Sequence, residues 1–207
     1  MTAAPLELLD ADELFMLGLQ SGTAGDAGSA IGYLKLALAK SPSHAKAHWA
    51  LAAEYAGLKM PDRAAQHFAS ALELDPTQPV ARFQYGLLML TSGQLGQAEA
   101  IWEPLGELDA QDPVRLFKDG LLHMVRDEFD AALASLRAAL ARPALDPALA
   151  RDIEMTIGRI EQAQREGAAP SGVGEVTDRD AAGAPAVSIE SHLALSAYRT
   201  GGSDSSH

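Results

Sequence analysis

The chain has 207 residues, 47% of them hydrophobic, and a formal net charge of −12. This length and apolar fraction are sufficient for a buried core and exclude a chain that is disordered throughout. The negative charge argues against nucleic acid or an anionic membrane as a partner, because both would repel the surface. Cysteine is absent, which excludes disulfides, thiolate nucleophiles and thiolate metal sites.

The first ten residues contain no basic side chain and no sustained apolar run. No later stretch approaches the roughly 20 consecutive apolar residues that a membrane-spanning helix needs. We therefore treat residues 1–10 as a lead-in and expect a cytoplasmic protein that does not insert into a membrane. The partner we expect is a protein or peptide.

A period of 34 residues organises the chain from residue 11 to residue 146. Two columns of small residues and one column of bulky apolar residues keep this spacing. The first small column is Gly18, Ala52, Gly86 and Gly120; the second is Ala30, Ala64, Ala98 and Ala132; the bulky column is Leu34, Phe68, Trp102 and Leu136. Small residues let two helices approach closely while a bulky one fills the adjacent space, so we predict that both small columns pack the repeats together.

Within each period the apolar residues follow helical spacing, which predicts two short helices per unit. The units are 11–44, 45–78, 79–112 and 113–146. Asp-Pro pairs at Asp75, Asp112 and Asp146 predict helix starts, with Asp as the cap and Pro in the first turn. Pro104 falls inside the second helix of the third unit and predicts a kink or an early end there.

This pattern resembles the tetratricopeptide repeat. The best match is 45–78, whose residues at the signature places are Leu51, Ala52, Tyr55, Ala64, Phe68, Ala71 and Pro76. The resemblance implies an all-α, right-handed solenoid of four helix-turn-helix repeats with a concave surface that holds another protein.

The remainder of the chain divides at residue 167. Residues 147–167 carry apolar side chains at helical spacing and predict a capping helix, with Glu154 at the place of the small column. Residues 168–207 are rich in Gly, Ala, Ser and Pro, a composition that predicts a disordered tail. Within it, residues 188–198 predict a short amphipathic helix.

An aromatic column with the same period marks a candidate binding surface. It consists of Phe15, Trp49, Phe83 and Phe117, and apolar residues accompany it at Leu87, Leu90, Leu121 and Met124. Resemblance to the family implies that these side chains line the concave groove and face a bound segment. The alternative is that they pack in the core, which a rotation of one residue along the helix would produce.

Polar candidates for a site are few. An acidic stretch or a terminal carboxylate could be held by Lys46, Arg82, Arg115 and Lys118. However, Leu19, Ala53 and Leu87 stand where the family's carboxylate clamp has asparagine, which favours an apolar groove. His44 and His48 lie four residues apart, the spacing of metal ligands on a helix, without an apparent third ligand. We interpret them as histidines at the join between units and expect no metal and no cofactor.

No phosphate-binding loop, nucleophile elbow or metal motif is apparent, so we expect a protein that is not an enzyme. The leading hypothesis is a scaffold or adaptor that binds an apolar or amphipathic peptide segment in the concave groove. One alternative is a chaperone like those of type III secretion, which also resemble short tetratricopeptide arrays. Another is a self-assembling or autoinhibited protein whose C-terminal helix occupies the groove.

Overall fold

The computed structural model describes residues 6–143 and 145–167, and the regular elements in these residues are helices. A short 3-10 helix, η1 (Leu6–Leu8), comes first. The α-helices are α1 (Ala11–Thr23), α2 (Ala27–Lys40), α3 (Ala45–Gly57), α4 (Pro61–Leu74), α5 (Pro79–Thr91), α6 (Leu95–Trp102), α7 (Pro113–Val125), α8 (Phe129–Leu140) and α9 (Pro147–Gly167), with η2 (Glu103–Glu107) after α6. The predicted tail, including the helix at 188–198, lies outside the described residues.

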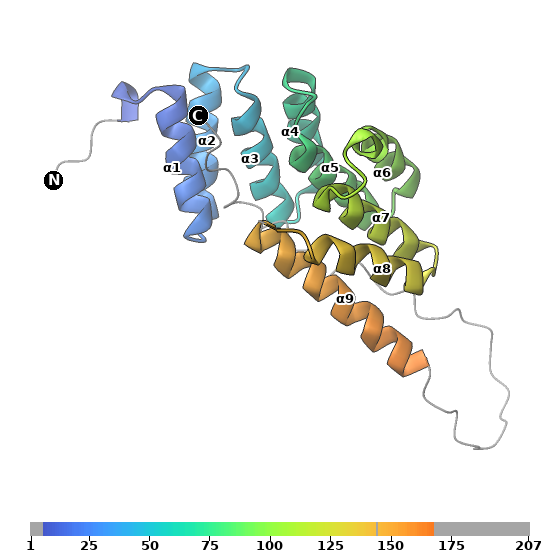
Figure 1. Cartoon of the computed structure of the whole chain (residues 1–207). Helices are drawn as coiled ribbons and strands as arrows, with labels where there is room; N and C mark the ends of the chain where they lie inside the picture. Colours follow the sequence, from blue (N-terminus) through green and yellow to red (C-terminus); the bar gives the residue numbers. More distant parts are fainter. Residues whose placement is uncertain (1–5, 144, 168–207) are drawn as a thin grey trace, which may run out of the picture.

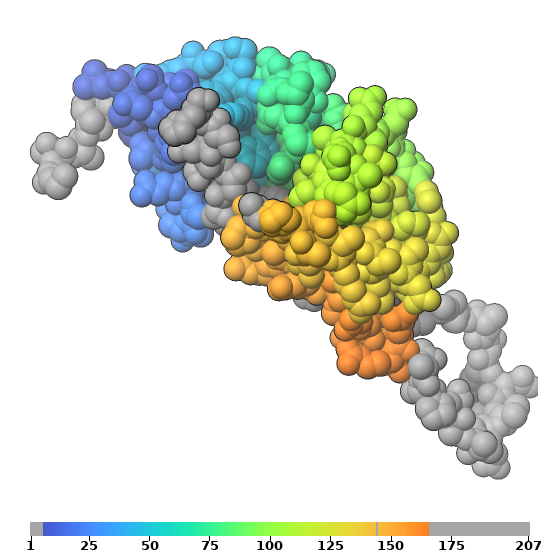
Figure 2. Space-filling model, viewed as in Figure 1, coloured from blue at the N-terminus to red at the C-terminus, as the bar shows by residue number. Residues whose placement is uncertain are grey.

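The helices pack in consecutive pairs: α1 on α2, α3 on α4, α5 on α6, and α7 on α8. Contacts of α2 with α3, of α4 with α5 and of α8 with α9 join the pairs into a stack. The stack follows the order of the sequence from α1 to α9 (Figure 1), and its side chains form a continuous body (Figure 2). The prediction of an all-α solenoid is therefore confirmed.

Side-chain caps explain several of the helix starts. Asp10 accepts a hydrogen bond from the Glu13 backbone at 2.8 Å, and Glu13 accepts one from the Asp10 backbone at 2.8 Å, which begins α1 with a capping box. Asp112 caps α7, and Asp146 accepts hydrogen bonds from the first turn of α9. The predicted start at Asp75 is wrong, because α5 begins at Pro79.

The turns inside the four pairs share one backbone conformation. Gly25, Lys59, Gly93 and Asp127 have φ angles of 82°, 57°, 75° and 59°. These residues are 34 apart in the sequence, so the left-handed position recurs once in each pair. Glycine adopts it without steric cost, whereas Lys59 and Asp127 adopt it against the preference of residues with a Cβ atom.

The second helix of the third pair ends early, as we expected from the position of Pro104. α6 ends at Trp102, and the chain continues as the 3-10 helix η2, which contains Pro104. Proline removes a backbone donor and clashes with the preceding turn, so the α-helix cannot continue through it.

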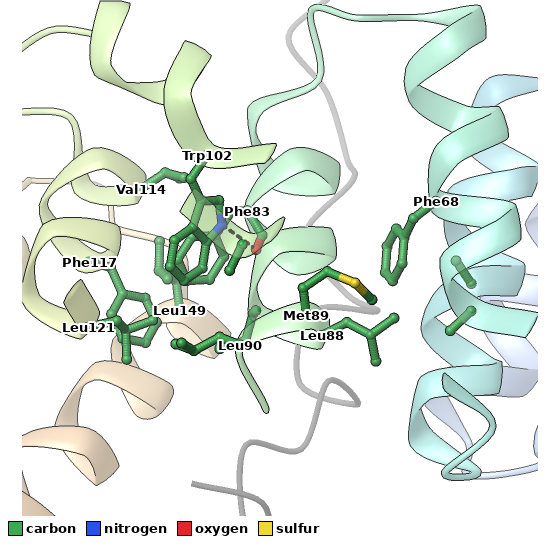
Figure 3. Close-up of a cluster of buried hydrophobic side chains, with 14 of the residues drawn as sticks. Phe68, Phe83, Leu88, Met89, Leu90, Trp102, Val114, Phe117, Leu121 and Leu149 are labelled. Carbon is green, nitrogen blue, oxygen red and sulfur yellow. Dashed lines mark hydrogen bonds between the residues drawn. The ribbon is translucent and has the colours of Figure 1, made fainter. Parts of the chain in front are cut away.

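A continuous core runs through the stack, and Figure 3 shows part of it. Trp102 is 1% exposed, and its indole N–H donates to the carbonyl oxygen of Phe83 at 2.8 Å. Its ring stacks on that of Phe83, with 5.8 Å between the ring centroids. Among the helices of the described residues, none has the length and apolar character required to cross a membrane.

Candidate functional site

A groove lies across the first helices of the first three pairs. Its volume is about 440 Å³. Its lining residues come from α1, from the start of α3 and from the start of α5: Asp12, Phe15, Met16, Leu19, His44, Lys46, Trp49, Gln78, Pro79, Val80 and Ala81. We call this the N-terminal groove. Apolar side chains form most of its wall, which suits an apolar ligand.

Trp49 is the only tryptophan among these lining residues. Its side chain is half-buried, and its indole N–H donates to Oε1 of Gln84 at 2.7 Å. Gln84 is completely buried in α5, and its Nε2 atom makes no hydrogen bond in the part of the chain described. The bond from Trp49 fixes the orientation of the indole, so one aromatic surface is held ready at the groove before any ligand arrives.

Polar side chains stand at the edge of the groove. Nε2 of His44 lies 3.0 Å from Oδ1 of Asp12, which links α3 to α1. The His44 ring packs against that of Phe15 with 5.0 Å between centroids. Lys46 and Asp12 are exposed, so the groove carries one cationic and one anionic side chain beside its apolar wall.

The predicted aromatic column divides into two halves. Phe15, 8% exposed, and the half-buried Trp49 line the N-terminal groove. Phe83 and Phe117 are 0% exposed, and their rings contact each other at 5.0 Å between centroids. The packing alternative therefore accounts for Phe83 and Phe117 in this conformation.

The other predicted groove residues lie in the same buried region. Leu87, Leu90 and Leu121 are buried, and Met124 is half-buried. Leu149 of α9 belongs to the same buried cluster as Leu90 and Phe117, and all three are labelled in Figure 3. The first turn of α9 thus contributes a side chain to the core cluster that contains these predicted groove residues.

The first small column lies where the two helices of a pair meet. A Cβ atom added to Gly18 would be 2.7 Å from Leu34 Cγ, and one added to Gly120 would be 2.8 Å from Leu136 Cγ. At Gly86 the added atom would overlap the indole of Trp102. The alanines of both columns are 0% exposed: Ala30, Ala52, Ala64, Ala98 and Ala132.

Met16 is an exposed groove residue that the sequence reasoning did not select. It is 60% exposed and lies in the groove beside Phe15. The column analysis followed one residue per unit, whereas a helix facing a groove presents adjacent positions as well. Testing the residue after each aromatic would have found it.

The histidines make hydrogen bonds inside the fold. His44 accepts from the Ala47 backbone at 3.1 Å and caps α3, and His48 lies with its Nδ1 atom 2.9 Å from Nδ1 of His67. In residues 6–143 and 145–167, no three His, Asp or Glu side chains are placed to hold a metal ion.

Comparison with known proteins places the fold. A family model described as tetratricopeptide repeat matches residues 55–116, while no curated protein matches the sequence. The structure of Cut9-Hcn1 from the APC/C superposes with a TM-score of 0.67 at 15% identity, over 75% of this chain but only 30% of that one. TTC0263 from Thermus thermophilus superposes with a TM-score of 0.59 at 19% identity, over 78% of this chain and 93% of that one.

A third structure, YrrB, is described as a tetratricopeptide-repeat protein with an unusual peptide-binding site. It superposes with a TM-score of 0.53 at 20% identity and covers 77% of this chain and 80% of that one. The stacked pairs thus define a helical repeat solenoid, an architecture that presents an extended surface for protein interaction. Part of the chain, residues 55–116, matches the tetratricopeptide-repeat model, and the solved structures share the fold of the stacked pairs.

Proposed function

We propose that the chain is a non-catalytic adaptor that binds an apolar or amphipathic segment of a protein partner in the N-terminal groove. The observation that carries this proposal is the exposed apolar wall around Trp49, which includes Met16 at 60% exposure. An apolar side chain from a partner would remove this surface from water, at about 25 cal/mol for each Å² buried.

The site in this proposal contains fewer of the aromatic residues than the one expected from the sequence. Phe15 and Trp49 remain as aromatic contacts, and Met16, Leu19 and Val80 extend the wall. Trp49 is the strongest candidate for the main energetic contact, because its indole is already oriented by Gln84 and loses little freedom when a ligand binds. The likeness of the fold to YrrB, which has a peptide-binding site, supports a peptide as the ligand.

The charges of the chain restrict the partner. A net charge of −12 disfavours strongly acidic segments at long range. The edge of the groove offers both Lys46 and Asp12, so a segment with an apolar centre and one charge of each sign would match it.

The C-terminal region supplies a second candidate occupant. Residues 188–198 contain Ile189, Leu193, Leu195 and Tyr198 after a linker at 168–185. A flexible linker of this length spans about 23 Å, and a tethered segment competes at an effective concentration in the millimolar range. Occupation by this segment would make the protein autoinhibited, or would join two copies if the segment reached a neighbour.

The direct test is selection of random peptides of about 12 residues displayed on phage against the full chain, followed by titration of the enriched peptides. We expect peptides rich in apolar residues, and we expect Met16→Glu to weaken their binding at least tenfold. Leu36→Glu is the matched control, because Leu36 is 41% exposed on α2 and does not line the groove. Equal loss in both variants, or no loss in either, would reject the groove as the binding site.

A further inference from the structure

α1 and α3 form two neighbouring walls of the N-terminal groove. They contact each other and lie side by side (Figure 1). The short connections on either side of α2, at 24–26 and 41–44, each reverse the direction of the chain, so α1 and α3 run the same way. Residues 34 apart in the sequence therefore occupy equivalent places on the two helices, and their side chains can be compared place by place.

Equivalent places at the edge of the groove carry opposite charges. Asp12 is the second residue of α1, and Lys46 is the second residue of α3. Both are exposed and line the groove, and the Asp12 side chain remains 89% exposed beside His44. After hydrogen bonds from Thr77, the charge of Lys46 helps to lower the pKa of Asp75. Neither charge is thus enclosed by the fold, and each can meet a partner.

The places about one turn further along the helices differ in size. Met16 and Leu19 occupy them on α1, and both line the groove. Ala50 and Ala53 occupy them on α3. Met16 is 60% exposed, whereas Ala50 is 5% exposed, so α1 projects a side chain where α3 presents almost none. Trp49, beside Ala50, offers an aromatic surface in the groove, and methionine sulfur contacts such surfaces favourably.

A surface with this pattern is complementary to itself. A two-fold axis parallel to the two helices would place α1 of one copy against α3 of another at equal height, and would do so twice. Asp12 would then face Lys46 of the second copy, and Met16 would face Ala50 and Trp49 of the second copy. Charge and size are complementary at both places.

We propose that the N-terminal groove binds a second copy of the chain, in a symmetric dimer in which α1 of each copy packs against α3 of the other. The proposal rests on the function proposed above in assigning binding to this groove, but the dimer needs no peptide. Met16 of the second copy covers Trp49, the residue that we expect to contribute most to peptide binding. A peptide therefore has to displace the second copy, and its apparent affinity falls as the protein concentration rises.

The net charge limits the strength of this dimer. Two copies that each carry −12 repel each other at long range. Salt reduces the range of that repulsion to about 8 Å at physiological ionic strength, whereas the pairs of Asp12 with Lys46 act in contact. The dimer is therefore reversible, and its formation depends on the protein concentration.

The direct test is sedimentation velocity of the full chain over a series of concentrations at about 150 mM salt. We expect wild type to pass from monomer to dimer. Asp12→Lys and Lys46→Asp should each weaken dimerisation about tenfold, because two symmetric pairs change from attraction to repulsion. Circular dichroism checks that the variants keep their helices.

Asp62→Lys is the matched control. Asp62 is the exposed second residue of α4, so the substitution makes the same change of charge at the same place in a helix as Asp12→Lys. Asp62 does not line the groove. This variant should dimerise like wild type.

An equimolar mixture of the two single variants gives the sharpest readout. When Asp12→Lys pairs with Lys46→Asp, both contacts of the mixed dimer join a lysine to an aspartate. The mixture should therefore dimerise like wild type although each variant alone is weakened. The double variant Asp12→Lys/Lys46→Asp should do the same with itself. Only reciprocal contacts between copies predict this recovery.

The dimer and the proposed function fail in different ways. A chain that stays monomeric at every concentration overturns the dimer and leaves a partner's peptide, or residues 188–198 of the same chain, as the occupant. Dimerisation of both single variants at wild-type strength, or a mixture as weak as its components, also overturns it, and none of these results affects peptide selection. A dimer with the expected charge dependence that binds no selected peptide rejects the proposed function alone.

Discussion

The indole of Trp102 occupies the space that any side chain at residue 86 would require. Gly86 lies in α5 and Trp102 ends α6, and a Cβ atom on Gly86 would overlap the five-membered part of the indole. The indole cannot move aside easily, because its N–H donates to the Phe83 carbonyl oxygen and its ring stacks on Phe83. The pair fixes the distance between the two helices of the third unit.

Gly86→Ala should therefore destabilise the protein. We expect a loss of roughly 1–3 kcal/mol, the range for overpacking a well-filled core, measured by urea denaturation monitored by circular dichroism. Gly120→Ala should cost less, because the Leu136 atoms that it meets lie 2.8 Å from the added Cβ atom, whereas the nearest indole atom lies 2.2 Å from the one added at Gly86. A cost at Gly120 equal to or above that at Gly86 would contradict the role we give to the rigid indole.

The control is Gly158→Ala in α9, where nothing lies within 4 Å of an added Cβ atom. Alanine favours a helix over glycine by about 1 kcal/mol. This variant should thus raise the free energy of unfolding while Gly86→Ala lowers it.

The left-handed turn position provides a second prediction. Lys59 has a φ of 57° and Gly93 has a φ of 75° at equivalent places in their pairs. Lys59→Gly should stabilise the protein or leave it unchanged, because it removes the steric cost of about 1 kcal/mol that a Cβ atom has in this region. Gly93→Ala should destabilise it by a similar amount. Thermal unfolding of the two variants side by side tests the opposite signs.

The two tryptophans should differ in their response to a fluorescence quencher. Trp102 is 1% exposed, whereas Trp49 is half-buried and lines the N-terminal groove. Iodide should quench the emission of Trp49 and leave that of Trp102. Adding a selected peptide should protect Trp49, and unchanged quenching at saturating peptide would place the ligand elsewhere.

Asp152 in α9 provides a prediction about the pH dependence of stability. Burial raises the pKa of Asp152 to about 6, and its Oδ1 atom makes no hydrogen bond in the described part of the chain. The folded form keeps the proton longer than the unfolded form, so this group favours folding at low pH. Its contribution is lost as the pH rises from about 4 towards 6.

Asp152→Asn should accordingly raise stability at about pH 7 by about 1–3 kcal/mol and have little effect at about pH 3.5. Denaturation of wild type and variant at the two pH values measures the difference. Glu154→Gln serves as the control, since Glu154 is exposed on the same helix. A pH-independent effect of Asp152→Asn would mean that folding does not raise the pKa of this carboxyl group.

Removal of residues 168–207 tests the internal occupant. If residues 188–198 compete for the groove, the truncated chain should bind selected peptides more tightly, because a tethered competitor lowers the apparent affinity. Isothermal titration of both chains measures this. Unchanged affinity together with unchanged oligomer size, read by light scattering, would remove the C-terminal segment as an occupant in cis or in trans.

The 34-residue period predicted the fold well because packing acts through neighbours. Gly86 and Trp102 could be assigned to facing helices from spacing alone, since each unit repeats the same local contacts. The stop at Pro104 was also predictable, because proline ends a helix by its own chemistry. The start of α5 was not, because Asp75 hydrogen bonds to Thr77 in a local turn instead of capping the helix.

The candidate site was only half predictable for a related reason. A periodic column treats Phe15 and Phe117 as equivalent, but their surroundings differ: Phe15 borders the groove, while Phe117 packs near Leu149 of α9. α9 follows the repeats and is not one of them, so its contribution to the core could not be found from the 34-residue spacing. The hydrogen bonds of His48 with Pro42 and His67 also join residues whose sequence separation, 6 and 19, suggests no contact.

Glu154 affects whether another helix can pack on the exposed side of α9. In the repeats, the equivalent place holds Gly or Ala, so that a bulky residue of the following helix can press against the backbone, as Leu34 does at Gly18. α9 presents an exposed carboxylate there instead, and covering it would strip the charge of water without compensation. α9 therefore resists the packing of a further helix on this surface, including one from a second copy of the chain.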